Sequence, residues 1–88
     1  MNYGELRKKI LDSISIVLVD ELEHLRELEE KGEISLEQYE DASLERKFEY
    51  QEWKDDLLLT EDSKLLEHFK YILERAEKIA TPPTNCLA

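Results

Sequence analysis

The chain has 88 residues, of which 22 are Asp or Glu and 12 are Lys or Arg, so its formal net charge is −10. This length excludes large barrels and full dinucleotide-binding folds, because their cores need more residues. The acidic balance argues against electrostatic binding of nucleic acid or of an anionic membrane surface. The single cysteine, Cys86, excludes an intrachain disulfide framework and a cysteine-based zinc site.

The first predicted element is a helix over residues 3–31. Apolar residues recur there at steps of three and four, as on one helix face, at Leu11, Ile14, Leu18, Leu25 and Leu28. Glu21 occupies the one charged position in this series. The β-branched segment at residues 13–19 also fits a strand, but a lone strand has no partner in this chain, so we interpret it as helix.

A turn and a second helix over residues 36–58 follow. Gly32 suits the left-handed conformation that commonly ends a helix. Ser35 and Gln38 have the spacing of a capping box, in which each side chain bonds the backbone of the other residue. These signals predict a helical hairpin.

The second helix carries apolar residues on two faces. An interrupted heptad stripe comprises Leu36, Tyr39, Ser43, Arg46, Tyr50, Trp53 and Leu57. Leu44 and Phe48 lie on a different face, four residues apart. A helix with two apolar faces is expected to contact two neighbours.

The third predicted helix spans residues 61–80. Thr60 is the expected N-cap, and Glu61 and Asp62 follow in the first turn, where the helix dipole favours anions. A regular heptad face is formed by Leu65, Phe69, Ile72, Ala76 and Ile79. Two prolines, Pro82 and Pro83, are expected to end the helix.

These elements predict an all-α fold, a three-helix bundle built on a long helical hairpin. Residues 1–81 form one domain, and residues 82–88 form a flexible C-terminal tail. The first helix is about 40 Å long and the third about 28 Å, so part of the hairpin is left uncovered in one chain. We therefore expect a homodimer, with an interface that comprises Ile14, Val17, Leu18, Tyr50 and Trp53.

The negative charge is concentrated in the hairpin, because residues 20–52 hold thirteen acidic and four basic residues. Four of the acids recur every four residues on the second helix: Glu37, Asp41, Glu45 and Glu49. Neighbours in this row are about 6 Å apart along the helix axis. The row is either a solvated face that keeps the protein soluble or a docking surface for a basic protein.

A metal site is an alternative hypothesis. Glu21 and His24 form a Glu-x-x-His pair of the kind that ferritin-like carboxylate bundles use twice, so a dimer could supply two pairs. The sequence otherwise offers no nucleophile beside a base and no glycine-rich loop. We expect no enzymatic activity and no cofactor.

The sequence thus predicts a small, cytoplasmic, non-catalytic helical module that binds a basic protein partner. A first alternative is an immunity-type or phage-type inhibitor that blocks a nucleic-acid enzyme through this acidic row, with mimicry of DNA as a stricter form of the same idea. The spacing of the row does not match DNA, because the acids lie about 6 Å apart along the helix axis, whereas one DNA strand carries a charge about every 3.4 Å. The second alternative is the dimeric metal protein. No apolar run approaches the roughly 18 residues of a membrane span.

Overall fold

The computed structural model describes residues 2–80 and contains, within that range, three α-helices, one short 3₁₀ helix and no strand. Helix α1 spans Tyr3–Glu30, α2 spans Leu36–Leu59, the 3₁₀ helix η1 spans Asp62–Lys64, and α3 spans Leu65–Ala80. The prediction of an all-α fold is confirmed. The predicted tail, which includes both prolines, lies outside the described residues.

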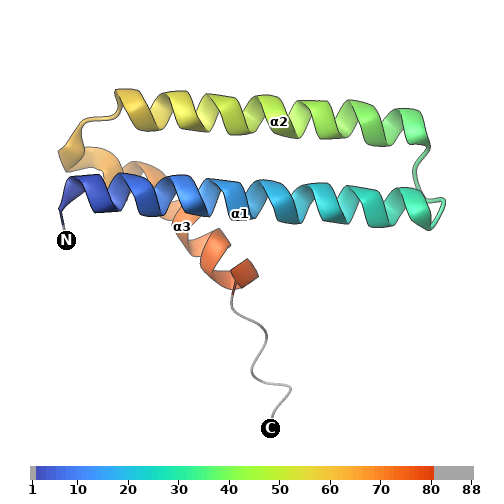
Figure 1. Cartoon of the computed structure of the whole chain (residues 1–88), viewed down its shortest axis with the longest axis horizontal. Helices are drawn as coiled ribbons and strands as arrows, with labels where there is room; N and C mark the ends of the chain where they lie inside the picture. The colour runs from blue at the N-terminus through green and yellow to red at the C-terminus, as the bar shows by residue number, and fades with distance from the viewer. Residues whose placement is uncertain (1, 81–88) are drawn as a thin grey trace, which may run out of the picture.

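Helix α1 is the central element of the fold. Helices α1 and α2 run antiparallel and side by side, while α3 turns back and crosses the N-terminal half of α1 (Figure 1). The extensive contacts between helices in the described chain are those of α1 with α2 and of α1 with α3. Helices α2 and α3 are therefore held together mainly through α1.

The hydrophobic core lies between α1 and α3. Its buried apolar residues are Leu6, Ile10, Ile14 and Val17 of α1, Leu57 of α2, and Leu65, Phe69, Ile72 and Ala76 of α3. The heptad face predicted for the third helix is the face that enters this core, although Ile79 at its end is only half-buried. Helix α2 contributes one buried apolar side chain, Leu57, so most of its packing surface is only partly covered.

The inner face of α2 matches the stripe that the sequence predicts from Tyr39 onward, whereas Leu36 at the start of that stripe is 59% exposed. Ser43 and Leu57 are buried, and Tyr39, Arg46 and Tyr50 are half-buried. The Tyr50 hydroxyl lies 3.2 Å from the Ser15 hydroxyl of α1, which fixes this face toward α1.

The turn between α1 and α2 follows the predicted capping signals. Gly32 has φ +78°, and its N–H donates to the Glu29 carbonyl while the N–H of Glu33 donates to the Leu28 carbonyl, which is a complete Schellman motif. At the start of α2, the Ser35 hydroxyl accepts from the Gln38 N–H at 3.0 Å, and the Gln38 side chain accepts from the Ser35 N–H at 2.8 Å. The predicted capping box is confirmed.

The prediction for Thr60 is wrong. Thr60 ends α2 instead of capping the third helix, because both its N–H and its hydroxyl donate to the Asp56 carbonyl. Residue Glu61 precedes η1 and provides no side-chain cap. Threonine can satisfy a preceding carbonyl as well as a following N–H, so the residue type alone does not decide between these roles.

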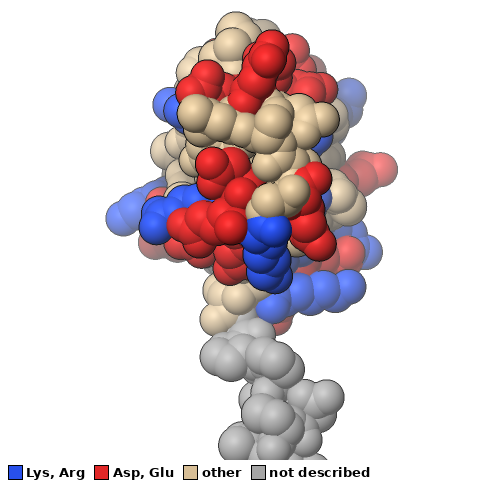
Figure 2. Space-filling model, turned by 90° about the vertical axis from the view of Figure 1, so that its right-hand side faces the viewer, with Lys and Arg blue, Asp and Glu red and all other residues tan. Residues whose placement is uncertain are grey.

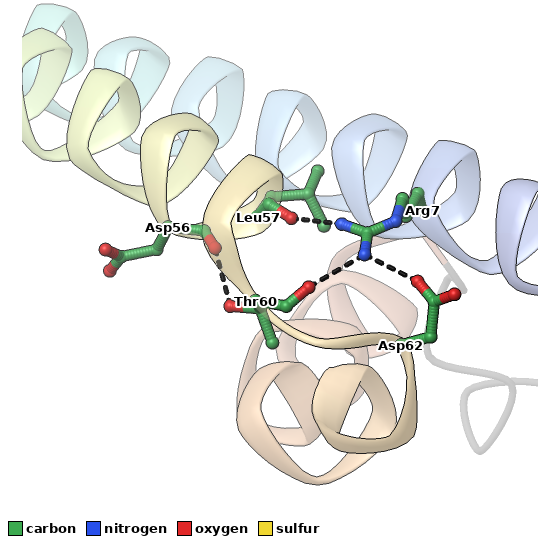
Figure 3. Close-up of polar contacts among 5 residues, drawn as sticks. All are labelled: Arg7, Asp56, Leu57, Thr60 and Asp62. Atoms are coloured by element: carbon green, nitrogen blue, oxygen red, sulfur yellow. Dashed lines mark hydrogen bonds and ion pairs between the residues drawn. The ribbon is translucent and has the colours of Figure 1, made fainter.

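Arg7 joins the start of α1 to the end of α2 (Figure 3). Its guanidinium donates to the carbonyl of Leu57, to the carbonyl of Thr60 at 2.7 Å and to the Asp62 carboxylate at 2.6 Å. The last carbonyls of a helix have no partner within the helix, so the arginine satisfies groups that would otherwise need water. The contact holds the α2–α3 connection against α1.

The far end of the hairpin consists of two helices only. We define the hairpin arm as residues 22–43, which lie beyond Glu21 and include the turn at Gly32. Helix α3 does not extend over this part of α1 (Figure 1). Within the arm no apolar side chain is fully buried, and residues Leu22, Leu25 and Leu28 are half-buried.

Removing the Arg7 contact is expected to destabilise the whole fold. Because hydrogen bonds to charged groups contribute about 1.5–3 kcal/mol each at most, Arg7→Met should lower the free energy of unfolding by about 2 kcal/mol in urea denaturation. The control Lys8→Met removes the same charge from an exposed neighbour, and should change the stability by less than about 0.5 kcal/mol. Equal effects of the two substitutions would show that Arg7 acts only through its charge.

Candidate partner-binding surface

The outer face of α2 points away from α1 and is exposed along its length. Its residues recur at steps of three and four and so form one line along the helix: Glu37, Asp41, Leu44, Phe48, Glu52 and Asp55. We call this line the outer stripe. The buried side chains of Ser43 and Leu57 lie on the opposite side of the helix.

Two large apolar side chains occupy the middle of the outer stripe. Leu44 is 56% exposed and Phe48 is 63% exposed. The expectation that both apolar faces of this helix contact neighbours is therefore wrong for a single chain, because α3 packs on α1 and leaves this face uncovered. A pair of adjacent apolar residues in such a setting is a candidate contact surface.

The four acidic residues predicted as a binding row divide into two groups. Glu37, Asp41 and Glu45 are exposed. Glu49 is half-buried and accepts a hydrogen bond from Arg46 at 2.8 Å, so its carboxylate is engaged within the chain. The structure therefore leaves three members of the row facing solvent, and Glu52 and Asp55 continue the acidic surface beyond Phe48.

The closed end of the hairpin also carries acidic side chains. Figure 2 looks onto this end and shows Asp and Glu over much of the visible face, with Lys and Arg among them and uncharged surface between. The hairpin arm holds eight acidic and two basic residues. Its charge is thus continuous with the acidic part of the outer stripe.

Glu21 links all three helices at the base of the arm. Its carboxylate lies 2.7 Å from the Arg75 guanidinium of α3 and 3.8 Å from that of Arg46 of α2. The Glu21 side chain is 16% exposed, so these ion pairs are partly shielded from water. The Tyr71 hydroxyl, which accepts from Arg75 at 3.4 Å, and the Glu21 carboxylate raise the pKa of Arg75 above its ordinary value.

The suggested metal pair, Glu21 and His24, lines an open hollow together with Arg46 and Arg75. The Glu21 carboxylate faces two guanidinium groups, and the His24 side chain is exposed. The hollow that these residues line has a volume of about 420 Å³. Residues 2–80 contain no group of three His, Cys, Asp or Glu side chains that could hold a metal ion. Two neighbouring cations disfavour binding of a metal cation at Glu21.

The predicted oligomer interface requires correction. Ile14 and Val17 are fully buried inside one chain, so they offer no surface to a second copy. Tyr50 and Trp53 are partly buried and pack against the same core. Leu18 is half-buried. The sequence identified these residues as apolar but could not distinguish a core from an interface, since both use the same side chains.

Comparison with known protein families, curated proteins and solved structures finds no match to this chain. No helix among residues 2–80 is both long enough and apolar enough to cross a membrane.

The Glu21 ion pairs are expected to contribute modestly to stability. Because both arginines are partly exposed, Glu21→Gln should lower the free energy of unfolding by about 1 kcal/mol. The matched substitution Glu23→Gln, at an exposed position two residues away, should be close to neutral. In an Arg75→Gln background the Glu21→Gln effect should shrink, and strictly additive effects in this double-mutant cycle would contradict the pairing.

Proposed function

We propose that the protein is a small, non-catalytic binding module that engages a basic protein partner through the acidic surface of its hairpin. The observation that carries this proposal is the exposed acidic outer stripe of α2, on the side of the hairpin that neither α1 nor α3 covers. Complementary charge accelerates association and selects partners by repelling the wrong ones. We place the protein in the cytoplasm, because a single cysteine is simplest to explain as a free thiol in a reducing compartment.

Inhibition of a nucleic-acid enzyme is one form that this function can take. An acidic helix would occupy the basic surface that normally holds the nucleic acid. The row Glu37, Asp41 and Glu45 has a spacing of about 6 Å, which is wider than the roughly 3.4 Å between charges of one DNA strand. The spacing favours recognition of a protein surface over close imitation of DNA.

Charge reversal tests the proposal with a defined probe, a synthetic lysine-rich amphipathic peptide titrated calorimetrically at physiological salt. The triple variant Glu37→Lys, Asp41→Lys, Glu45→Lys should weaken binding by about tenfold or more, because three attractions become repulsions. The control triple Asp12→Lys, Glu67→Lys, Glu77→Lys makes the same change in net charge at exposed positions of α1 and α3.

Circular dichroism should show unchanged helicity for both triple variants, because all six positions are exposed. If the control triple weakens binding as much as the hairpin triple, the peptide responds only to net charge, and the proposed surface is wrong.

We also propose that the protein forms a homodimer. Its interface would use exposed residues of α1 in place of Ile14 and Val17, which are buried inside one chain. Ile16 is 37% exposed and Val19 is 55% exposed, and the two lie about one turn apart on α1. Covering such a pair removes apolar surface from water. Light scattering at micromolar concentration should give the mass of a dimer, and Val19→Glu should give that of a monomer. A monomeric parent protein would contradict this proposal.

A further inference from the structure

The outer stripe of α2 contains apolar as well as acidic residues, and they follow one another in a definite order along the helix. Two acids, Glu37 and Asp41, precede the apolar pair Leu44 and Phe48, and further acids follow it. From residue 37 to residue 55 the stripe is about 27 Å long at 1.5 Å per residue. Between residues 37 and 55 it is therefore a narrow, straight surface with an apolar centre flanked by acids, and Leu59, which is 84% exposed, lies one turn beyond Asp55.

The basic residues of α2 leave this stripe acidic. Lys47 and Lys54 lie about 100° or more around the helix from Phe48. The Lys54 ammonium lies 5.4 Å from the centre of the Tyr50 ring and is half-buried there, on the side of α2 that faces α1. Neither lysine neutralises the acids on either side of the apolar pair.

A second copy of the chain is a poor occupant for this surface. If two α2 helices packed antiparallel about Leu44 and Phe48, Glu37 of one copy would oppose Asp55 of the other. If they packed parallel, each acid of the stripe would oppose itself. Like charges directly opposed are unfavourable, so self-association through this face would bring acids together in either orientation.

We propose that the outer stripe binds an amphipathic helix of a partner protein, with apolar residues at its centre and Lys or Arg toward both ends. The apolar residues would cover Leu44 and Phe48, and the basic residues would pair with the flanking acids. A helix fits because the surface is straight, one helix wide and about 27 Å long, which matches about 18 helical residues. This inference rests on the proposed function and adds the shape and the apolar centre of the partner.

The test uses three synthetic 18-residue helical peptides with the full-length protein. The first has two central leucines four residues apart with lysines one turn to either side, the second has serines in place of the leucines, and the third has glutamates in place of the lysines. The first should bind at least about tenfold more tightly than either of the others. Leu44→Ser and Phe48→Ser should each reduce its affinity by about tenfold, since both lose a buried apolar contact.

The control substitutions are matched in exposure. Leu66 is 59% exposed and Tyr71 is 63% exposed, both on α3 and away from the stripe, so Leu66→Ser and Tyr71→Ser should leave the affinity unchanged. All four positions are exposed, and circular dichroism should show the parent helicity in each variant.

Three results would overturn the inference. The first is equal binding of the leucine and serine peptides, which would leave the acidic surface of the proposed function intact but remove the apolar contact. The second is no binding of the leucine peptide at millimolar concentration. The third is a dimer that Leu44→Ser dissociates, because a second copy would then be the occupant. Failure of the proposed function itself would instead appear as equal effects of the two charge-reversal triples.

Discussion

The Arg7 guanidinium is the contact on which the arrangement of the three helices depends. It binds the carbonyls of Leu57 and Thr60 at the end of α2 and the carboxylate of Asp62 at the start of η1. One side chain near the beginning of the chain thereby fixes the point at which the chain reverses after α2. Because α3 begins at this point and has only 16 residues, it can cover only part of the 28-residue α1.

This constraint separates the protein into a packed half and an uncovered half. Where α3 crosses α1, the core contains Ile10, Ile14 and Phe69, all buried. Beyond Glu21, two helices pair without a third, and their apolar residues stay half-buried or, at Leu36, exposed. The same geometry leaves the outer face of α2 open to solvent. The lengths of the helices therefore concentrate the buried core in one half of the hairpin, while the exposed outer stripe of α2 runs along both halves.

The sequence predicted the helices better than their packing. Gly32, Ser35 and Gln38 are local signals, and the structure uses all three as expected. The role of Thr60 was predicted wrongly, since threonine can satisfy backbone groups on either side of it. The contact between Arg7 and Leu57 joins residues 50 positions apart, and no local pattern indicates it.

The candidate surface was only partly predictable, because exposure and pairing depend on contacts between residues far apart in the sequence. The acids on α2 are evident from their spacing, but the engagement of Glu49 by Arg46 depends on side-chain geometry. The apolar character of Leu44 and Phe48 is plain in the sequence, whereas their exposure depends on where α3 lies. Glu21 stood out as a charge within an apolar series, and only the fold reveals that its partner on α3 is Arg75.

Native-state hydrogen exchange of the backbone amides tests the division into two halves most directly. Amides of α1 around residues 10–17 and of α3 around residues 69–76 should be the slowest to exchange and should report global unfolding. Amides of the hairpin arm, residues 22–43, should exchange through local opening at a clearly lower free energy. Equal protection of the arm and the core would contradict the account, since it would mean that the arm is covered and as stable as the rest of the protein.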